Sequence, residues 1–494
     1  DMRKQSKEPH VIAFLTLCMN KEEKAYIRSM NWKEKLKWKL LIILIALIGI
    51  LIVWCAGKAG ERKAVTEKEI LREYAQKENE WASAETELPK ESQSQQEAEA
   101  PEEAMEEPSI RVVLMTNDYE SYYHSEVSLE FQGTYQTEGV IQKTFSSGEK
   151  ITLKTGCQEL ANGSLRFLPE NQECRIALTS LKRGQGVPSY KGSLEIYEDE
   201  YGLYLVNELP LEDYLCGVVP SEMPSAYPKE ALKAQAVCAR TYACVQLESK
   251  KLEQLHGQVD DSVSYQVYQN TAEAESANEA VQETKGEILL KDGNPIQAYY
   301  FSTSHGKTST DEVWETASPA SYLKSVDCTY DSQEPWYQWE VLVSKENILK
   351  NVQQLLPEVK EVQRVEIVEK GEGDAVLHLK VETEQGAKSF YSEYDIRSVL
   401  APLGAEIIRQ DGSSVKGGKL LPSAYFTMEE QTDTAGVWTG YQIKGGGYGH
   451  GVGMSQNGAK GMADTGKTYE EILNYFYQEV ELGQVQDVVK KENP

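Results

Sequence analysis

The chain contains little cysteine and little positive charge for its length. Its 494 residues include 8 cysteines, too few and too scattered for a disulfide-stabilised scaffold. Lysine and arginine number 51 against 78 aspartates and glutamates, and the net charge of −27 excludes a nucleic-acid backbone as partner of the whole chain. Phenylalanine is scarce, with 8 residues beside 28 tyrosines, and tyrosine suits partly wetted surfaces. The length allows two or three folded domains.

Long hydrophobic runs are absent except at residues 40–56, which contain no charged side chain. Four lysines precede this run and tryptophans flank it, a pattern typical of a membrane-spanning signal anchor. We therefore predict a single-pass protein of the cell membrane, with residues 1–39 in the cytoplasm and the C-terminal domain outside. A cleaved signal peptide and a buried soluble helix are the alternatives. Because Met30 would make a conventional start, residues 1–29 are a candidate over-long gene model.

Residues 57–108 are predicted to form an acidic, flexible stalk. From Glu78 to Pro108 the chain contains eleven glutamates and one lysine, with glutamine, serine, alanine and proline between them. Such a segment cannot bury enough apolar surface to offset the entropy that it would lose on ordering. The sequence thus predicts an extracytoplasmic folded domain at residues 109–490.

Short segments rich in β-branched and aromatic residues dominate the first third of this domain, and helical patterns follow. No fixed-period repeat and no regular strand–helix alternation is present. We therefore predict an α+β (mixed α/β) fold that is rich in strands and contains a few helices. The expected strands are 110–115, 127–131, 150–153, 165–168, 193–197, 203–206, 286–290 and 296–301, and the expected helices are 228–247, 272–284, 345–355, 392–400 and 469–477.

Glu222 is the first candidate for chemistry. It lies between Pro220 and Pro224 and beside Val219 and Met223. Apolar neighbours disfavour the ionised carboxyl, so the pKa of Glu222 is predicted to rise towards the value that a general acid needs near neutral pH. The two prolines are expected to fix the backbone around it. A solvated loop glutamate is the alternative on this local pattern.

Two cations follow on the helix predicted at 228–247. Lys233 and Arg240 are seven residues apart, which places them on one helix face. Two cations just after a candidate acid suit the polar or anionic groups of a substrate. Ordinary exposed residues are the alternative.

A glycine-rich segment at 445–461 holds eight glycines in seventeen residues. It matches neither the phosphate-binding nor the dinucleotide-binding glycine pattern, and the surroundings of Ser455 do not match a serine-hydrolase elbow. His450, Ser455 and Gln456 form a candidate polar cluster for substrate binding. A tight structural turn is the alternative.

A hydroxyl-rich patch follows the strand predicted at 296–301. Six of the nine residues at 302–310 are serine or threonine. Hydroxyl groups in such a loop suit hydrogen bonding to sugars, so Ser302 and Ser304 are candidate substrate contacts.

Together these motifs resemble the stage II sporulation protein D family of bacteria. The resemblance rests on residues 211–224, on 230–243, on 301–304 and on 449–459, in this order along the chain. Three long motifs in one order are highly specific. The resemblance spans about residues 110–480.

This family resemblance implies a lytic transglycosylase, a lyase that cleaves peptidoglycan glycan strands during sporulation and leaves 1,6-anhydro-N-acetylmuramic acid ends. It implies a preference for strands stripped of stem peptides, and partners among membrane-bound cell-wall proteins, including an amidase. It further implies that Glu222 is the catalytic acid and base and that Lys233 and Arg240 serve activity or substrate binding. Asp213 and Asp261 are the next carboxylates to test.

The chain departs from the family pattern in places. Some relatives carry cysteine or histidine near the stretch that corresponds to 259–265, where a metal could bind; this chain has neither, so no required metal or other cofactor is predicted. His305 and Asn457 stand where other residues are common in the family, which leaves the details of substrate contact open. The same domain occurs in amidase enhancers. A non-catalytic glycan-binding module that recruits or enhances a cell-wall amidase is therefore the alternative function.

Overall fold

The computed structural model describes residues 107–489, with the exception of residue 317. The predicted cytoplasmic segment at 1–39 and the predicted anchor at 40–56 lie outside the described residues, as does the predicted stalk up to residue 106. Within the described part, no helix combines the length and the hydrophobicity that crossing a membrane requires.

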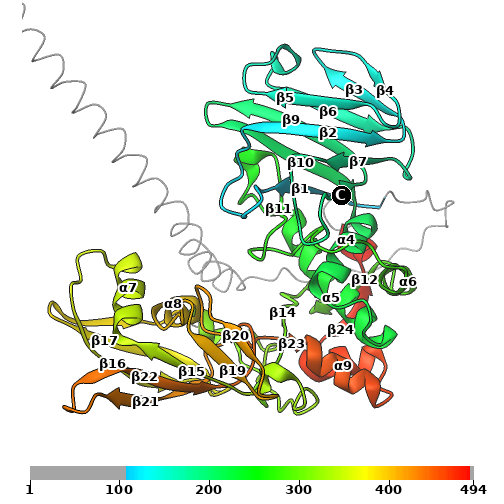
Figure 1. The fold of residues 1–494 in the computed structure, drawn as a ribbon. Coiled ribbons are helices and arrows are strands. Elements are labelled where there is room, and N and C mark those ends of the chain that lie inside the picture. Colours follow the sequence, from blue (N-terminus) through cyan, green and yellow to red (C-terminus); the bar gives the residue numbers. More distant parts are fainter. Residues whose placement is uncertain (1–106, 317, 490–494) are drawn as a thin grey trace, which may run out of the picture. The chain divides into compact units, whose positions relative to one another are not determined.

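Two sheets pack face to face in the N-terminal β-module (Figure 1). In β2, every second side chain is buried, and the buried Phe131 contacts Phe145 and Phe167 of the other sheet, with ring centroids 4.4 and 5.4 Å apart. The sheet orders are β11-β1-β10-β9-β6-β3-β4 and β5-β2-β7-β8. The strands are β1 (Ser109–Leu114), β2 (Glu126–Gln132), β3 (Tyr135–Gly139), β4 (Thr144–Phe145), β5 (Lys150–Lys154), β6 (Ser164–Pro169), β7 (Arg175–Leu178), β8 (Ser189–Tyr190), β9 (Ser193–Asp199), β10 (Gly202–Pro210) and β11 (Val259–Asp260).

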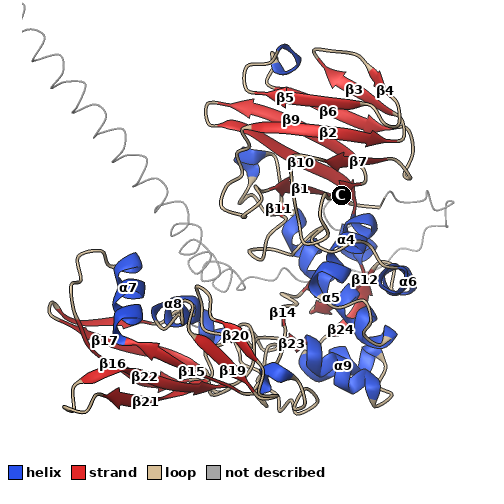
Figure 2. Cartoon of the chain, in the orientation of Figure 1, coloured by secondary structure: helices blue, strands red, loops and turns tan. Residues whose placement is uncertain are grey.

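A helical module is built from the middle and the C-terminal end of the described chain, and its helix α5 (Lys229–Leu247) packs against α4, α6, α9 and α10. Figure 2 shows α5 beside α4, α6 and α9. Helix α5 starts after Pro228, contains five alanines and no glycine, and is buried along most of its length. The other helices of this helical module are α4 (Leu211–Glu222), α6 (Glu275–Glu283), α9 (Gln456–Asp464), α10 (Tyr469–Phe476) and α11 (Val485–Val489). Its strands are β12 (Glu287–Lys291), β13 (Asn294–Pro295), β14 (Tyr300–Phe301), β23 (Met454–Ser455) and β24 (Glu481–Gln484).

A second β-module lies between β14 and β23 in the chain and has a hydrophobic core of its own. Its five-stranded sheet, in the order β20-β19-β15-β22-β21, and its three-stranded sheet β16-β17-β18 contribute to this core. The elements are β15 (Trp339–Ser344), α7 (Lys345–Leu355), β16 (Val362–Lys370), β17 (Val376–Thr383), β18 (Gly386–Phe390), α8 (Glu393–Val399), β19 (Glu406–Arg409), β20 (Ser414–Lys416), β21 (Phe426–Thr432) and β22 (Trp438–Gly445). We call it the C-terminal β-module.

The predicted α+β class is confirmed, and the helix predicted at 345–355 has the bounds of α7. The strand predicted at 296–301 is shorter, because the N–H of Tyr299 turns back to the carbonyl of Gln297 (2.9 Å) and the ladder starts at Tyr300. The segment around Pro220 is the last turn of α4, so Glu222 does not lie in the loop that was the alternative for it.

Candidate active site

Glu222 is the last residue of α4. The helix tolerates Pro220 in its final turn, and the N–H of Met223 still bonds to the carbonyl of Val219 (2.9 Å). Met223 then adopts an extended conformation, as a residue before proline prefers, and Pro224 ends the helix. The two prolines therefore set where the helix stops, and Glu222 lies at that point.

The Glu222 carboxyl is held without a cation. Its Oε1 accepts a hydrogen bond from the backbone N–H of Val267 (2.6 Å), and the Tyr300 hydroxyl donates a second one. Both bonds favour the ionised form, but burial outweighs them and raises the pKa of Glu222 to about 7. Glu222 forms no ion pair with any described residue. The direction of the shift agrees with the sequence-based prediction.

Gln266 ties Tyr300 to the helices beneath it. Its Nε2 donates to the Tyr300 hydroxyl (3.1 Å) and to the carbonyl of Ala239 on α5 (3.2 Å), and its Oε1 accepts from the Tyr214 hydroxyl of α4 (3.2 Å). Gln266 is almost fully buried. The hydrogen-bond chain leaves the Tyr300 hydroxyl with its proton for Glu222.

The loop at 261–271, which supplies Val267, is fastened to α4 at its far end. The Ser221 hydroxyl accepts the N–H groups of Asn270 and Thr271, both at 3.1 Å, and donates to the carbonyl of Gly217 (2.7 Å). The loop also approaches α4 so closely that a Cβ on Gly217 would overlap the ring of Tyr268. Residues 221 and 222 are therefore positioned together by one loop.

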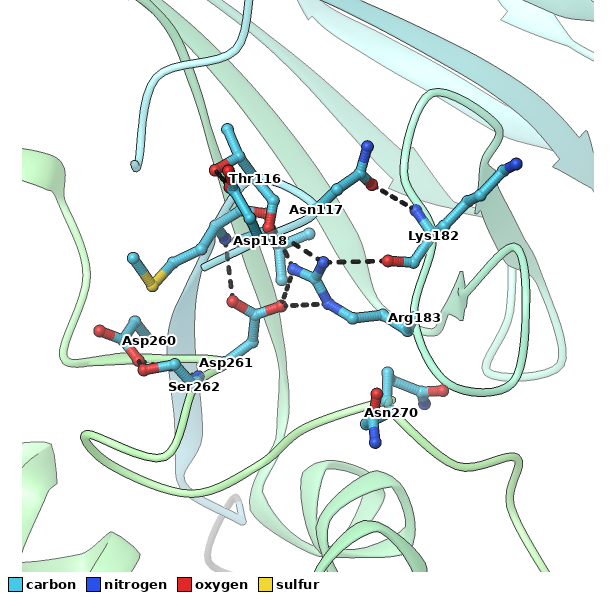
Figure 3. Close-up of polar contacts among 12 residues, drawn as sticks. Thr116, Asn117, Asp118, Lys182, Arg183, Asp260, Asp261, Ser262 and Asn270 are labelled. Atoms are coloured by element: carbon cyan, nitrogen blue, oxygen red, sulfur yellow. Dashed lines mark hydrogen bonds and ion pairs between the residues drawn. The ribbon is translucent and has the colours of Figure 1, made fainter. Parts of the chain in front are cut away.

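The near end of the same loop is fastened by a buried ion pair. Asp261 accepts two hydrogen bonds from Arg183, at 3.1 and 2.5 Å, and one from the backbone N–H of Met115 (2.9 Å). Figure 3 shows the guanidinium of Arg183 facing this carboxylate. Neither side chain is exposed, and Arg183 also donates to the carbonyls of Met115 (2.8 Å) and Thr116 (3.1 Å). Asp261 is thus fully occupied within the fold.

Asp213, which the sequence proposed beside Asp261 as a carboxylate to test, also forms an ion pair. Its Oδ1 accepts from Lys191 Nζ (2.8 Å). Of the three carboxylates that the sequence proposed, Glu222 alone has no ion pair in the described chain.

Arg240 does not lie at the Glu222 site, contrary to the sequence-based expectation of a substrate contact. Its side chain is fully buried and makes a bidentate ion pair with Glu212 of α4 (2.8 and 2.7 Å). The remaining N–H groups donate to Thr284 (3.5 Å) and to the carbonyls of Val281 (3.1 Å) and Glu287 (3.1 Å). All five donors are used inside the protein, so Arg240 joins α4, α5, α6 and β12.

Lys233 lies on the α6 side of α5. Its Nζ is 2.8 Å from Glu283 of α6 and 3.4 Å from Glu230. These acids raise the pKa of Lys233. Its side chain is largely covered, and it lies over the ring of Tyr469. The ion pair to Glu283 takes up its charge.

The glycine-rich segment reaches Glu222 through Gln456. Strand β23 pairs in parallel with β14, which places Met454 opposite Tyr300. The next residue but one, Gln456, donates to the backbone carbonyl of Glu222 (3.1 Å) and to Gln235 Oε1 of α5 (3.3 Å). The structure therefore brings Gln456 to the candidate acid.

His450 holds the two strands rather than facing open solvent. Its Nε2 donates to the carbonyl of Tyr300 (3.0 Å), and its Nδ1 accepts the N–H of Val452 (3.2 Å). Burial lowers the pKa of His450 to about 4, so the ring is neutral at pH 7. With both nitrogens bonded, His450 is a positioning residue for Tyr300.

Ser304 and Ser455 are fully buried and share one carboxylate, Asp331. The Ser304 hydroxyl donates to Asp331 Oδ1 (2.8 Å), and the Ser455 hydroxyl donates to Oδ2 (2.7 Å). Ser455 also caps α9 by accepting the N–H of Gly458 (3.1 Å). These two serines therefore join loops of the protein instead of reaching a ligand.

Ser302 is the predicted hydroxyl that stays partly exposed. It lies two residues after Tyr300, and its hydroxyl contacts that of Thr303 (3.1 Å). The Ser302 carbonyl accepts the N–H of Asn457 (3.0 Å), whose amide side chain donates to Thr303 (2.9 Å). The Asn457 side chain also accepts from the Tyr227 hydroxyl. A partly exposed row of polar groups thus continues from Gln456.

The glycines of this segment are required by close backbone packing. Gly451 and Gly453 both have positive φ, at 86° and 77°. A Cβ on Gly453 would overlap the carbonyl oxygen of Tyr299, and one on Gly451 would overlap the Tyr425 hydroxyl. The two interpretations of the glycine-rich segment, a tight structural turn and a polar cluster, are thus compatible, because the turn places Gln456 beside Glu222.

Sequence reasoning missed Val267, Gln266 and Asp331, which touch the site from distant loops. Tyr300 lies in the strand predicted at 296–301, but nothing local marks it as a partner of Glu222. Within the part of the chain that the structure describes, no cluster of three or more His, Cys, Asp or Glu side chains could hold a metal ion, and all the described cysteines are free.

Two family models match parts of this chain. The family model described as "Stage II sporulation protein" matches residues 199–290, which include α4 and α5. A second model, described as a domain of unknown function, matches residues 321–453 and thus the C-terminal β-module.

The chain is 33% identical over 301 residues to Stage II sporulation protein D of Bacillus subtilis, a match that covers 58% of this chain and 78% of that protein. It is 30% identical over 306 residues to the protein of the same name from Bacillus amyloliquefaciens, again covering 58% and 78%. A protein of B. subtilis named Amidase enhancer is 29% identical over 298 residues, which cover 53% of this chain and 39% of that protein. The chain therefore belongs to the stage II sporulation protein D family.

Proposed function

We propose that the protein is a lytic transglycosylase that cleaves the glycan strands of peptidoglycan during sporulation and leaves 1,6-anhydro-N-acetylmuramic acid ends. Family membership supports a sporulation role connected with the cell wall. The observation that carries the reaction is Glu222, a half-buried carboxyl with a pKa near 7 and no cationic partner in the described chain. We further propose that one helix at 40–56 holds this domain at the outer side of the cell membrane.

In the first half of the reaction, protonated Glu222 donates its proton to the glycosidic oxygen, and the bond from the sugar carbon to that oxygen breaks. The departing sugar leaves as a neutral alcohol. The electron-poor carbon that remains is oxocarbenium-like. A pKa of about 7 keeps a large share of Glu222 protonated at neutral pH, which this step requires.

In the second half, the 6-hydroxyl of the same N-acetylmuramic acid attacks that carbon and closes the anhydro ring. Glu222, now ionised, takes the hydroxyl proton and returns to its starting state. The N–H of Val267 and the hydroxyl of Tyr300 stabilise the carboxylate between the two steps. Because no water is activated, a second carboxylate is unnecessary.

The partly exposed polar groups near Glu222 are the proposed substrate contacts. Ser302 and Gln456 come from the two segments that pair beside Tyr300. Lys233 and Arg240 act by holding α5 against α6 and α4, and thereby support the helix that carries Gln235.

A second candidate function is a glycan-binding module that enhances a cell-wall amidase. The observation that favours it is the 29% identity to a protein named Amidase enhancer. Such a module would bind glycan strands without releasing any product. An amidase and other membrane-bound cell-wall proteins are proposed partners under either function.

Mass spectrometry of glycan strands incubated with the full chain separates these functions. Anhydro-muramic ends support a transglycosylase, reducing ends indicate a hydrolase, and intact strands that co-sediment with the protein indicate a binding module. We expect Glu222→Gln to release product about 10²–10⁴-fold more slowly, since glutamine cannot donate the proton. The matched control is Glu275→Gln, which removes an exposed carboxyl of α6. Equal cleavage by Glu222→Gln and by the unaltered protein would refute the assignment.

A further inference from the structure

A groove of about 580 Å³ opens along one edge of the C-terminal β-module, away from the residues that contact Glu222. We call it the β15 groove, because Trp339 and Glu340 at the start of β15 contribute to its lining. The side chains that the argument uses are His305, Tyr337, Lys370, Arg409, Tyr425 and Lys444.

The charges in the β15 groove are not balanced. Lys444 lies 3.8 Å from Glu429, and the lining residue Asp374 lies 3.5 Å from Lys307. Glu340, the other acid of the lining, contacts the amide of Gln442 (3.5 Å).

Two cations of the groove are not held in an ion pair, although the Ser413 hydroxyl and Arg409 both lower the pKa of the nearby exposed Asp411. Lys370 and Arg409 form no ion pair with any residue between 107 and 489 that the structure describes. Arg409 uses its Nε for the Ser413 hydroxyl (2.9 Å), and its two terminal nitrogens make no hydrogen bond to a described residue. The groove is lined by three cations (Lys370, Arg409 and Lys444) and two acids (Glu340 and Asp374), and this excess of positive charge in a chain with a net charge of −27 suits an anion.

The walls of the β15 groove are aromatic. His305 stacks on Tyr425, with ring centroids 4.0 Å apart, and Tyr337 is half-buried beside them. Burial lowers the pKa of His305 to about 4, so this ring adds no charge at neutral pH. Flat apolar walls with polar tips and two cations suit a sugar that carries a carboxylate better than they suit a bare inorganic anion.

A continuous row of contacts leads from Glu222 to this groove. The row starts at Gln456, and the neighbouring Asn457 bonds to Thr303 (2.9 Å). Thr303 pairs through its backbone with Tyr448, whose exposed ring lies against Trp336 with centroids 4.7 Å apart.

Arg409 completes this row. Its guanidinium lies over the ring of Trp336, 5.3 Å from the centroid, and also lines the groove. Thr303 is buried, but Gln456, Tyr448 and Trp336 are exposed or partly exposed, so a polymer bound at Glu222 finds polar and aromatic side chains at intervals on the way to Lys370 and Arg409.

We infer that the β15 groove is a distal subsite for the glycan strand, in which Arg409 and Lys370 bind the free carboxylate of an N-acetylmuramic acid unit. The inference rests on the proposed function only in taking a glycan strand as the ligand. In intact peptidoglycan this carboxylate is consumed by its amide bond to the stem peptide. The subsite therefore accepts strands whose peptides have been removed.

The test measures binding rather than cleavage. The full chain with Glu222→Gln is titrated with glycan strands stripped of stem peptides, and with the same strands after conversion of their carboxylates to neutral methylamides. We expect methylamidation to weaken binding about tenfold. Adding Arg409→Gln and Lys370→Gln should weaken binding to the carboxylate strands by a similar factor and abolish the preference between the two strands.

A control variant and a charge-conserving variant are both available in the C-terminal β-module. Lys416→Gln removes an exposed lysine of β20 outside the groove and should leave the preference unchanged. Arg409→Lys keeps the positive charge and should therefore retain part of the preference for carboxylate strands. A double variant that still prefers carboxylate strands as strongly as its parent would overturn the inference. This outcome is independent of cleavage, so a protein that binds carboxylate strands through the groove but releases no anhydro product would refute only the proposed function.

Discussion

Glu222 and Asp261 are two acids that contact or belong to the same loop, and they differ in their enclosure and in the groups that face their carboxyls. Asp261 is fully enclosed and receives two hydrogen bonds from Arg183. Glu222 is half-buried and receives one backbone N–H and one tyrosine hydroxyl. Burial raises the pKa of both groups, to about 6 for Asp261, where Arg183 opposes the rise, and to about 7 for Glu222.

The comparison shows that the partner of a buried carboxyl decides whether it stabilises the fold or exchanges a proton. A carboxylate with a buried guanidinium cannot give up its charge without leaving that cation unpaired, so it serves as a fastening. A carboxyl that is enclosed by neutral groups exchanges its proton near neutral pH at little cost to the fold. The loop at 261–271 uses the first kind of acid to hold the second.

The largest effect on folding is expected from breaking the Asp261 fastening. Arg183→Met leaves a buried carboxylate without its cation and should lower the free energy of unfolding by about 3–5 kcal/mol. Urea unfolding followed by circular dichroism measures this loss. Arg175→Met, which removes a partly exposed ion pair with Glu273, is the matched control and should cost about 1 kcal/mol or less. If both variants lost the same free energy of unfolding, the Asp261 ion pair would not be a stronger fastening than an ordinary, partly exposed ion pair.

A smaller effect, of opposite sign, is expected at Glu222. Its pKa in the folded protein lies above the ordinary value of 4.5, so the stability that the protonated form provides is complete below pH 4.5 and is lost as the pH rises through 7. Glu222→Gln should therefore be more stable than the unaltered protein at pH 9, by roughly 1–3 kcal/mol, and nearly equal to it at pH 4.5. Urea unfolding at both pH values tests this, and a variant that is less stable at pH 9 would contradict it.

The smallest effect is expected from Tyr300→Phe. The Tyr300 hydroxyl favours the ionised form of Glu222, so its removal should raise the pKa of Glu222 further. Under the proposed function, kcat/KM falls as the pH rises through about 7 because the proton donor ionises. In Tyr300→Phe this fall should move to higher pH by about one unit or less. A pH–rate profile that moves to lower pH would show that Tyr300 does not act through this hydrogen bond.

The local sequence pattern predicted many of the helices and strands and the raised pKa of Glu222, but not the residues that contact Glu222. The apolar neighbours gave the right direction for its pKa, because burial is a property of nearby residues. A loop position for Glu222 stayed open as the alternative, since proline is costly inside a helix, yet the final turn of α4 accommodates Pro220. Val267 and Tyr300 lie 45 and 78 residues further along the chain, and no periodicity links them to Glu222.

Helical spacing placed Lys233 and Arg240 on one face, but it could not say what covers that face. The answer is Glu283 of α6 and Glu212 of α4, which are too distant in sequence to be read as partners. The serines were misread for a related reason. The hydroxyl-rich patch and the glycine-rich segment suggested substrate contacts, whereas Ser304 of the first and Ser455 of the second both donate to the buried carboxylate of Asp331.

The hydrogen bond from Gln456 to Glu222 has a consequence for the protein during its synthesis. The two residues are 234 positions apart, so at the usual pace of translation Gln456 is made on the order of 10–50 s after Glu222. Strand β23, the partner of β14 beside Tyr300, appears equally late. A nascent or prematurely ended chain thus carries the acid without the segment that completes its surroundings. Under the proposed function, the proton donor therefore lacks one of its neighbours until synthesis has passed Gln456.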